Sequence, residues 1–153
     1  MLTDEIKKSI KNSVLCWLAS SYIDGTPNVS PKEIFTYYGV SKIIIANIAS
    51  PQSMRNIKSN PRACISFVDV FVQKGFKLTG KAGIVDKTHS EFESMQNRLE
   101  ELTAGKFPFK QIIAFEIEKI SPIVAPKYMF YPETTEESQI KSARDQYNQI
   151  HPA

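Results

Sequence analysis

The 153-residue sequence is poor in the side chains that hold metals. It has two cysteines, Cys16 and Cys64, without a C-x-x-C spacing, and two histidines, His89 and His151. Zinc sites and redox pairs need clustered cysteines or histidines, and an axial histidine for heme has few candidates. Both cysteines lie in apolar segments, where a free thiol acts as a small buried hydrophobe. The sequence therefore argues against a metal site and favours free thiols over a disulfide.

Long apolar runs and clusters of basic residues are also missing. No run approaches the ~18 apolar residues of a membrane span, and the charged start at residues 1–5 lacks the apolar core of a signal peptide. The lysines are scattered and the formal net charge is only +3, whereas a nucleic-acid-binding protein usually carries a basic stripe. We therefore expect a cytoplasmic protein with neither a membrane nor a nucleic acid as its partner.

The composition is that of an ordinary globular protein, with 42% hydrophobic and 23% charged residues. A chain of this length buries most of its apolar surface without disulfides or a metal. We predict a single domain over residues 1–153, with a C-terminal helical extension at about 133–150. The extension carries Ile140, Ala143 and Tyr147.

Short apolar runs separated by turn signals predict a mainly β protein. The expected strands are residues 14–19, 27–35, 41–47, 62–71, 74–85 and 111–120. Asp24-Gly25 is a strong hairpin signal, and the glycines within 74–85 indicate a bulge, a barrel corner or a close approach to a ligand. Six strands joined mostly by tight turns predict a small antiparallel barrel with helices packed outside.

Helical spacing predicts a short helix at residues 4–12 and another that begins with a capping box formed by Thr88 and Glu91. Four apolar residues line one face of the second helix: Phe92, Met95, Leu99 and Leu102. Gly105 would end it. Before the C-terminal helix, residues 125–132 are expected to be irregular and are rich in aromatic side chains.

The most informative segment begins at Ser50, soon after the apolar run at residues 43–46. Ser50 is a good N-cap, and Pro51 fits the first position of a two-turn helix. The free backbone N–H groups at the start of this helix form a site suited to a phosphate. The strand segment Pro27–Lys32 supplies a lysine close enough in sequence to share the site. Together the two segments predict a phosphate-bearing cofactor.

Several features follow one another in a characteristic order. They are Pro-Asn-Val-Ser-Pro-Lys at 27–32, the strand leading into Ala46-Asn47-Ile48, Ser53 and Asn56 in the short helix, Asn60-Pro61-Arg62, and the segment from Gly75 to Gly80. Over residues 5–120 or so, this ordered set resembles the flavin-nucleotide-binding split-barrel family that includes pyridoxamine 5'-phosphate oxidase. The resemblance implies a six-stranded antiparallel split barrel of the FMN-binding type. It also implies a homodimer with one FMN at each side of the subunit interface.

The resemblance further places the flavin phosphate near the start of the short helix and the flavin ring against strand edges. Carried over by position, the candidate cofactor-binding residues are Ser30, Pro31, Lys32, Asn47, Ile48, Ser50, Gln52, Ser53 and Asn56, with Lys74 and Gly75 facing the partner subunit's flavin. Ser53 offers a hydroxyl and a backbone N–H to the phosphate, and Lys32 or Arg55 supplies positive charge. Backbone groups at Asn47 and Ile48 would hydrogen-bond the polar edge of the ring.

The chain also departs from the oxidase. The oxidase carries an adjacent arginine and lysine at the helix start, where this chain has Pro51-Gln52-Ser53, and the arginine and histidine that hold its substrate have no match after Ser121. We therefore expect an FMN-binding, oxidoreductase-like protein of unidentified substrate, with no catalytic residue assigned. The alternative is a non-catalytic module that binds or stores flavin or heme. Taken singly, the candidate residues are also typical of surface charges, helix caps and turns.

Overall fold

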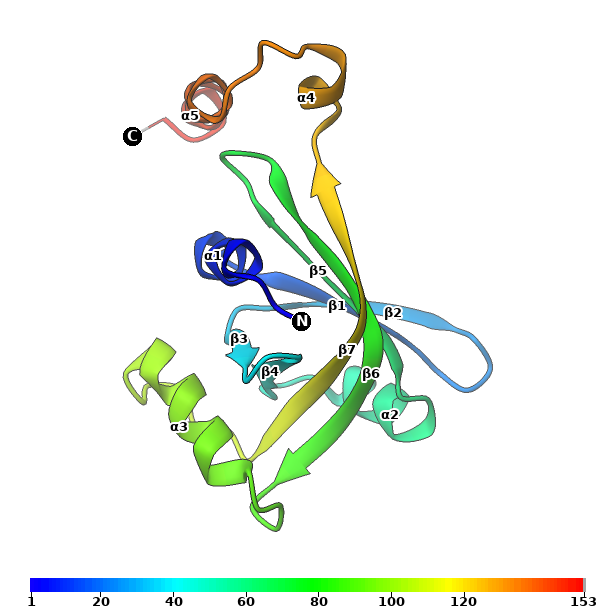
Figure 1. Ribbon diagram of the computed structural model, residues 1–153. Helices are drawn as coiled ribbons and strands as arrows, with labels where there is room; N and C mark the ends of the chain where they lie inside the picture. The colour runs from blue at the N-terminus through cyan, green and yellow to red at the C-terminus, as the bar shows by residue number, and fades with distance from the viewer. Residues whose placement is uncertain (153) are drawn as a thin grey trace.

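The computed structural model describes residues 1–152, whose strands form one seven-stranded antiparallel sheet in the order β2-β1-β5-β6-β7-β4-β3. The strands are β1 (Cys16–Ser21), β2 (Pro27–Lys32), β3 (Phe35–Tyr38), β4 (Lys42–Ala46), β5 (Arg62–Asp69), β6 (Lys74–Asp86) and β7 (Gln111–Val124). The helices are α1 (Asp4–Asn12), α2 (Pro51–Ser59), α3 (Phe92–Thr103), α4 (Pro126–Phe130) and α5 (Glu136–Ile150). The long strands β6 and β7 curve, so the sheet curls into a half-barrel (Figure 1).

The predicted mainly β fold is confirmed, but the expected number of six strands is wrong. The predicted strand at 27–35 breaks at Glu33 and Ile34 into β2 and β3, which form opposite edges of the sheet. No glycine or proline marks this break, and both halves are extended. A pattern of extended residues does not reveal which neighbour each half pairs with, and here β2 pairs with β1 while β3 pairs with β4.

Two apolar clusters hold the half-barrel and its helices together. The larger cluster fills the inside of the curled sheet and includes Leu18, Phe67, Leu78 and Phe115, together with Ile6 and Ile10 of α1 and Met54 and Ile57 of α2. The smaller cluster packs α3 against β4 and β7, through Ile44, Met95, Leu99 and Ile112. Strand β4 lies between the two clusters, which explains its continuous apolar run.

The glycines of β6 are explained mainly by neighbouring strands. The register of β6 against β7 shifts between Thr79 and Gly80, which agrees with a bulge, one of the three alternatives that the glycines indicated. A Cβ atom at Gly80 would lie 2.0 Å from the carbonyl oxygen of Glu116, and one at Gly75 would lie 2.0 Å from that of Phe67. Both positions therefore require glycine because another strand's backbone is in the way.

Helix α3 begins at Phe92, so the predicted capping box is wrong. Glu91 occupies the N-cap position without a side-chain cap bond. The Asp86 carboxylate competes for Thr88, accepting hydrogen bonds from its backbone N–H at 3.0 Å and from its hydroxyl at 2.7 Å. The helix ends where Ala104 adopts a left-handed φ of 49°, just before the predicted Gly105.

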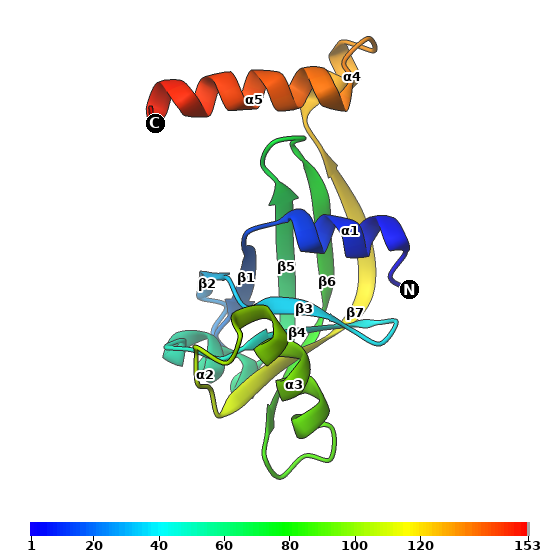
Figure 2. The same ribbon diagram turned by 90° about the vertical axis from the view of Figure 1, so that its left-hand side faces the viewer.

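The C-terminal extension begins earlier than the predicted residue 133: residues 125–150, which follow β7, lie beyond one end of the sheet, over the tip of the β5–β6 hairpin (Figures 1 and 2). Helix α4 forms within the segment expected to be irregular, and α5 starts at Glu136 rather than at 133. Thr135 and Ser138 form a capping box that fixes this start. Within residues 1–152, no helix is both long and apolar enough to cross a membrane.

Candidate functional site

The amine of Lys32 lies where the end of β2 meets the start of α2. It donates hydrogen bonds to the hydroxyl of Ser30 at 2.6 Å and to the hydroxyl of Ser50. Lys32 is only 6% exposed and forms no salt bridge with any carboxylate of residues 1–152. Burial lowers the pKa of Lys32, since the charged form has lost water without gaining a counter-ion. A bound anion would relieve this cost.

Ser50 holds Lys32 rather than capping α2. It occupies the N-cap position as predicted, but its side chain makes no cap bond. Its hydroxyl accepts from Lys32 and donates to the carbonyl of Ile48 at 3.1 Å. The N–H groups of the first helical turn therefore donate no hydrogen bond to the cap side chain, at the end of the helix that carries partial positive charge. This helix start, beside a buried amine, is complementary to a phosphate.

A chain of amide hydrogen bonds fixes α2 against β1. The Nδ2 of the fully buried Asn56 donates to the hydroxyl of Ser20 at 3.1 Å, and its Oδ1 accepts from Nε2 of Gln52 at 2.8 Å. The Oε1 of Gln52 in turn accepts from Nη2 of Arg55 at 2.6 Å. Ser53, which is 1% exposed, accepts from Nδ2 of Asn28 at 3.4 Å. The side-chain amides of Gln52 and Asn56 are thus engaged at both ends by the protein itself.

Asn47 carries a buried acceptor without a partner. Its backbone N–H and its Nδ2 donate to Gln111, at 3.0 Å to the backbone carbonyl and 3.5 Å to Oε1. Its Oδ1 is buried and has no hydrogen-bond partner among the described residues. Ala49, at a left-handed φ of 50°, then turns the chain into α2. Buried acceptors are rarely left unpaired, so this oxygen fits a ligand that presents an N–H group.

A hollow of about 220 Å³ lies beside Lys32. Its lining combines two charged residues, Lys32 and Glu33, with apolar side chains, namely Pro31, Ile34, Ala46, Ile48 and the half-exposed Phe107. Sites for small organic ligands combine mostly apolar walls with a few polar groups. The hollow, the buried amine and the open helix start together fit a ligand with a flat apolar part and an anionic end.

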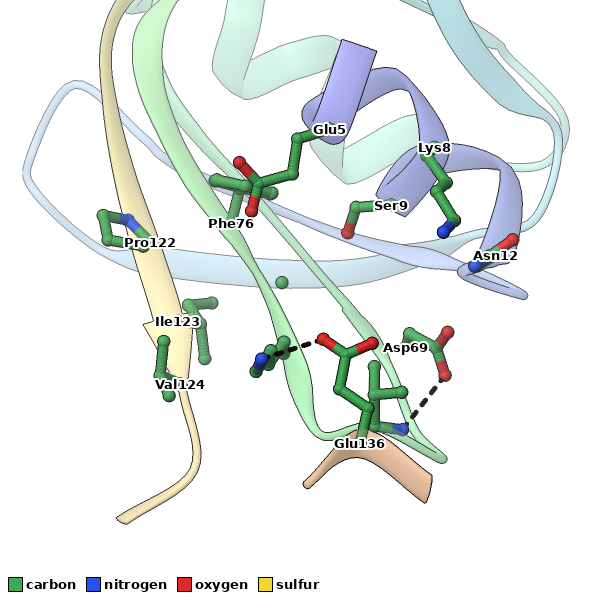
Figure 3. Close-up of a pocket in the computed structure, with 13 residues that line it drawn as sticks. Glu5, Lys8, Ser9, Asn12, Asp69, Phe76, Pro122, Ile123, Val124 and Glu136 are labelled. Carbon is green, nitrogen blue, oxygen red and sulfur yellow. Dashed lines mark hydrogen bonds and ion pairs between the residues drawn. The ribbon is translucent and has the colours of Figure 1, made fainter. Parts of the chain in front are cut away.

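The predicted cofactor-binding residues fall into two groups in space. Ser30, Pro31, Lys32, Asn47, Ile48, Ser50, Gln52, Ser53 and Asn56 all lie on β2, on α2 or on the segment from β4 into α2. Lys74 and Gly75 instead line a separate hollow of about 170 Å³, between α1, the β5–β6 hairpin, the end of β7 and α5 (Figure 3). Within one subunit these two residues do not join the Lys32 group. Their place opposite a partner's flavin stays a prediction.

Lys74 has partners that the protein supplies. Its amine lies 2.8 Å from Oε1 of Glu136 and 4.4 Å from the ring centroid of Tyr128, both in the C-terminal extension. The hydrogen bond to Glu136 raises the pKa of Lys74. In Figure 3, Glu136 reaches the hollow from α5, and Glu5 and Ser9 reach it from α1. Lys74 therefore connects the extension to the sheet.

Sequence reasoning missed three residues that shape the site: Ser20, Asn28 and Gln111. Asn28 had a usable signal, because alternate residues of a strand share a face and Asn28, Ser30 and Lys32 are alternate. Ser20 and Gln111 had none. They are brought to the site by strand pairing and chain packing between residues distant in sequence.

The sequence matches the family model of pyridoxamine 5'-phosphate oxidase over residues 2–123. Among crystal structures, HupZ of Group A Streptococcus is 25% identical with a TM-score of 0.69, over 82% of this chain and 99% of HupZ. An FMN-binding protein from Syntrophomonas wolfei is 20% identical with a TM-score of 0.66, over 80% of this chain and 86% of that one. HutZ, the heme storage protein of Vibrio cholerae, is 20% identical with a TM-score of 0.61, over 80% and 94%. No curated protein matches the sequence.

Proposed function

This chain belongs to the pyridoxamine 5'-phosphate oxidase family, and from that membership we propose that it binds FMN, with the flavin phosphate at the start of α2. The observation that carries the proposal is Lys32, a buried amine with hydroxyl partners and with no carboxylate partner among residues 1–152. A phosphate would supply the missing negative charge and would accept from the free N–H groups of the helix. The FMN-binding relative from Syntrophomonas wolfei supports FMN as the phosphate-bearing ligand.

The flavin ring would occupy the hollow beside Lys32. Ile48 and Phe107 provide apolar contact there, and Oδ1 of Asn47 is the acceptor available to a ring N–H. Bound FMN supplies hydride or electron transfer by its own chemistry. The residues of this chain would hold the phosphate, orient the ring and exclude water from it. We therefore propose an oxidoreductase role, and the substrate is unassigned.

We extend the proposal to a homodimer, because one subunit offers only part of a flavin site. The hollow of about 220 Å³ is smaller than the roughly 300–1,000 Å³ of ordinary ligand pockets. Trp17 and Val29, on adjacent strands, are 46% and 60% exposed, and Phe71 is 41% exposed. Apolar side chains exposed in this way favour a protein partner. Light scattering after gel filtration at micromolar concentration should give the dimer mass, and a monomer mass would contradict this extension.

Titration of the purified protein with FMN tests the central proposal. We expect saturable quenching of flavin fluorescence, and about tenfold weaker FMN binding in Lys32→Met, because the phosphate loses a charge-assisted hydrogen bond. Lys58→Met is the matched control, since it removes one positive charge from the other end of the same helix. Absence of FMN binding by the unmodified protein would reject the proposal. Equal affinity in Lys32→Met would reject the phosphate position.

Two further measurements separate catalysis from storage. Reduction of the bound flavin by NADH or NADPH would support an oxidoreductase. A flavin that binds but is never reduced would favour the storage module. If the protein binds hemin and gives a Soret band but does not bind FMN, a heme storage role like that named for HutZ replaces our proposal.

A further inference from the structure

The hollow of about 170 Å³ beside Lys74 receives a carboxylate of the protein itself. Its apolar wall includes Phe76 on β6 and Ile123 near the end of β7. Glu136 reaches into it from α5 (Figure 3), and its Oε1 lies 2.8 Å from the amine of Lys74. An apolar wall beside a fixed charge is typical of a site for a small organic ligand. Here a carboxylate of the chain occupies the charged position.

Lys74 and Glu136, the two members of this ion pair, are not held equally. Lys74 lies on β6, which pairs with β5 on one side and with β7 on the other. Glu136 is the first residue of α5, a helix that buries only Gln139 and Ala143. The Oε1 of Gln139 is buried without a hydrogen-bond partner among residues 1–152, so undocking of α5 returns this acceptor to water. The amine is therefore the fixed member of the pair, and the carboxylate is the replaceable one.

The direction of Lys74 does not depend on Glu136 alone. Its amine lies 4.4 Å from the ring centroid of Tyr128 in α4. The hydroxyl of Tyr128 donates to the backbone carbonyl of Val72 at 2.8 Å, which fixes the ring against the β5–β6 hairpin. Residues 131–135 separate α4 from α5. Movement of α5 therefore leaves Lys74 beside the apolar wall, with its charge available.

We infer that this hollow binds a small organic carboxylate with an apolar body, and that Glu136 holds the carboxylate position when the ligand is absent. The ligand's carboxylate pairs with Lys74 and accepts a hydrogen bond from its amine. Its apolar part packs on Phe76 and Ile123, and Ser9 offers a hydroxyl from α1. This site is separate from the Lys32 group, and the inference does not rest on the proposed FMN function.

The charges of the lining favour a ligand with a single negative charge. When Glu136 is withdrawn, the charged side chains that remain are the carboxylates of Glu5 and Asp69 and the amines of Lys8 and Lys74. The two signs then balance, and the charge of Glu5 already acts on Lys74. A second negative charge on the ligand would be repelled by Glu5 and Asp69.

Benzoate is the probe, because it carries one carboxylate on a flat apolar ring. In a titration of the full chain followed by NMR of the backbone amides, we expect saturable shifts at Gly75 and Ile123. Benzylamine carries a positive charge on the same ring and should leave these signals unchanged. Absence of benzoate shifts around the hollow overturns the inference. Equal binding of benzylamine overturns the ligand class.

Single substitutions test the replacement of Glu136 by the ligand. Lys74→Met should weaken benzoate binding about tenfold, because the charge-assisted hydrogen bond is lost, and Lys77→Met on the opposite face of β6 should not. Glu136→Gln should strengthen it about threefold, since the competing carboxylate is removed at nearly constant side-chain size. Glu137→Gln is the matched control, because Glu137 does not line the hollow. Equal affinities in Glu136→Gln and Glu137→Gln overturn the role of Glu136.

The competition acts in both directions, because coupling between two binding events is reciprocal. Saturating benzoate should therefore speed the hydrogen exchange of the α5 amides about threefold in the unmodified protein. Unchanged exchange with benzoate bound would mean that the ligand binds beside a docked α5, and would overturn the replacement of Glu136. Excess FMN should not release benzoate. Release would place Lys74 at the partner's flavin, as the sequence predicted, and would overturn a separate site.

Discussion

The half-barrel and the C-terminal extension are held in place by different physical means. Inside the half-barrel, side chains such as Leu18, Ile65 and Phe115 are completely buried, and each such burial contributes about 1.5–3 kcal/mol. In α5 only Gln139 and Ala143 are buried. The extension is joined to the sheet by polar and aromatic contacts at its rim, each contributing roughly 0.5–1.5 kcal/mol. The half-barrel is therefore expected to unfold as one unit, whereas the extension can detach without it.

Lys32 and Lys74, the two lysines at the candidate sites, differ in burial and in the chemical type of their partners. Lys74 is half-exposed at the junction with the extension and is paired with Glu136. Lys32 is buried in the half-barrel and has only hydroxyl partners. The charge of Lys74 is already balanced by the Glu136 carboxylate, without a ligand. A buried lysine without one marks the place where the fold tolerates an energetic cost, which is typical of functional sites.

A pair of phenylalanine truncations should show the difference between the regions most strongly. Phe115→Ala removes a completely buried ring from the half-barrel, so the free energy of unfolding should fall by about 3–5 kcal/mol. Phe130→Ala removes a ring that is 75% exposed in α4, and the change should stay within about 0.5 kcal/mol. Urea titration followed by circular dichroism measures both. Equal losses would mean that the extension unfolds together with the half-barrel.

A second pair, in β6, separates a packing role of Gly75 from its predicted role at a flavin. Gly75→Ala would place a Cβ atom 2.0 Å from the carbonyl oxygen of Phe67, so we expect a loss of about 1–3 kcal/mol. Gly83→Ala meets no atom within 4 Å and should stabilise the strand by about 0.5–1 kcal/mol. Urea midpoints compare the two variants. If Gly75→Ala is as stable as Gly83→Ala, the strand does not require glycine at position 75.

The sequence predicted those parts of the molecule that depend on local pattern. The start of α2 after Ser50, the strand containing Lys32 and the bulge at Gly80 all have signals within a few residues. The break between β2 and β3 does not, because it depends on which strands each half pairs with. The same holds for the contact between Ser20 and Asn56. Ser50 shows a further limit of prediction from local sequence. The sequence favoured a side-chain cap on α2, but the hydroxyl of Ser50 accepts a hydrogen bond from Lys32, 18 residues away in sequence.

The smallest expected effect is a pH dependence of opposite sign for the two lysines. The unfolded chain protonates a lysine with a pKa near 10.5. Because burial lowers the pKa of Lys32, the unfolded state binds more protons as pH approaches 10.5 from below, and stability should rise with pH relative to Lys32→Met. Glu136 raises the pKa of Lys74. The stability that charged Lys74 adds, relative to Lys74→Met, should therefore be fully present below pH 10.5 and be lost above it.

Urea titrations at a series of alkaline pH values would measure these differences between each variant and the unmodified protein. Burial also raises the pKa of the Cys16 thiol, to about 12, whereas the nearby charge of Lys32 lowers it. Because Lys32→Met would also change the titration of Cys16, the Lys32 comparison is made in a Cys16→Ala background. Excess FMN should abolish the rise assigned to Lys32, since a bound phosphate restores the charged amine. A rise that persists unchanged with FMN bound would mean that the phosphate does not reach Lys32. The contrast between an unpaired and a paired lysine would then lose its functional meaning.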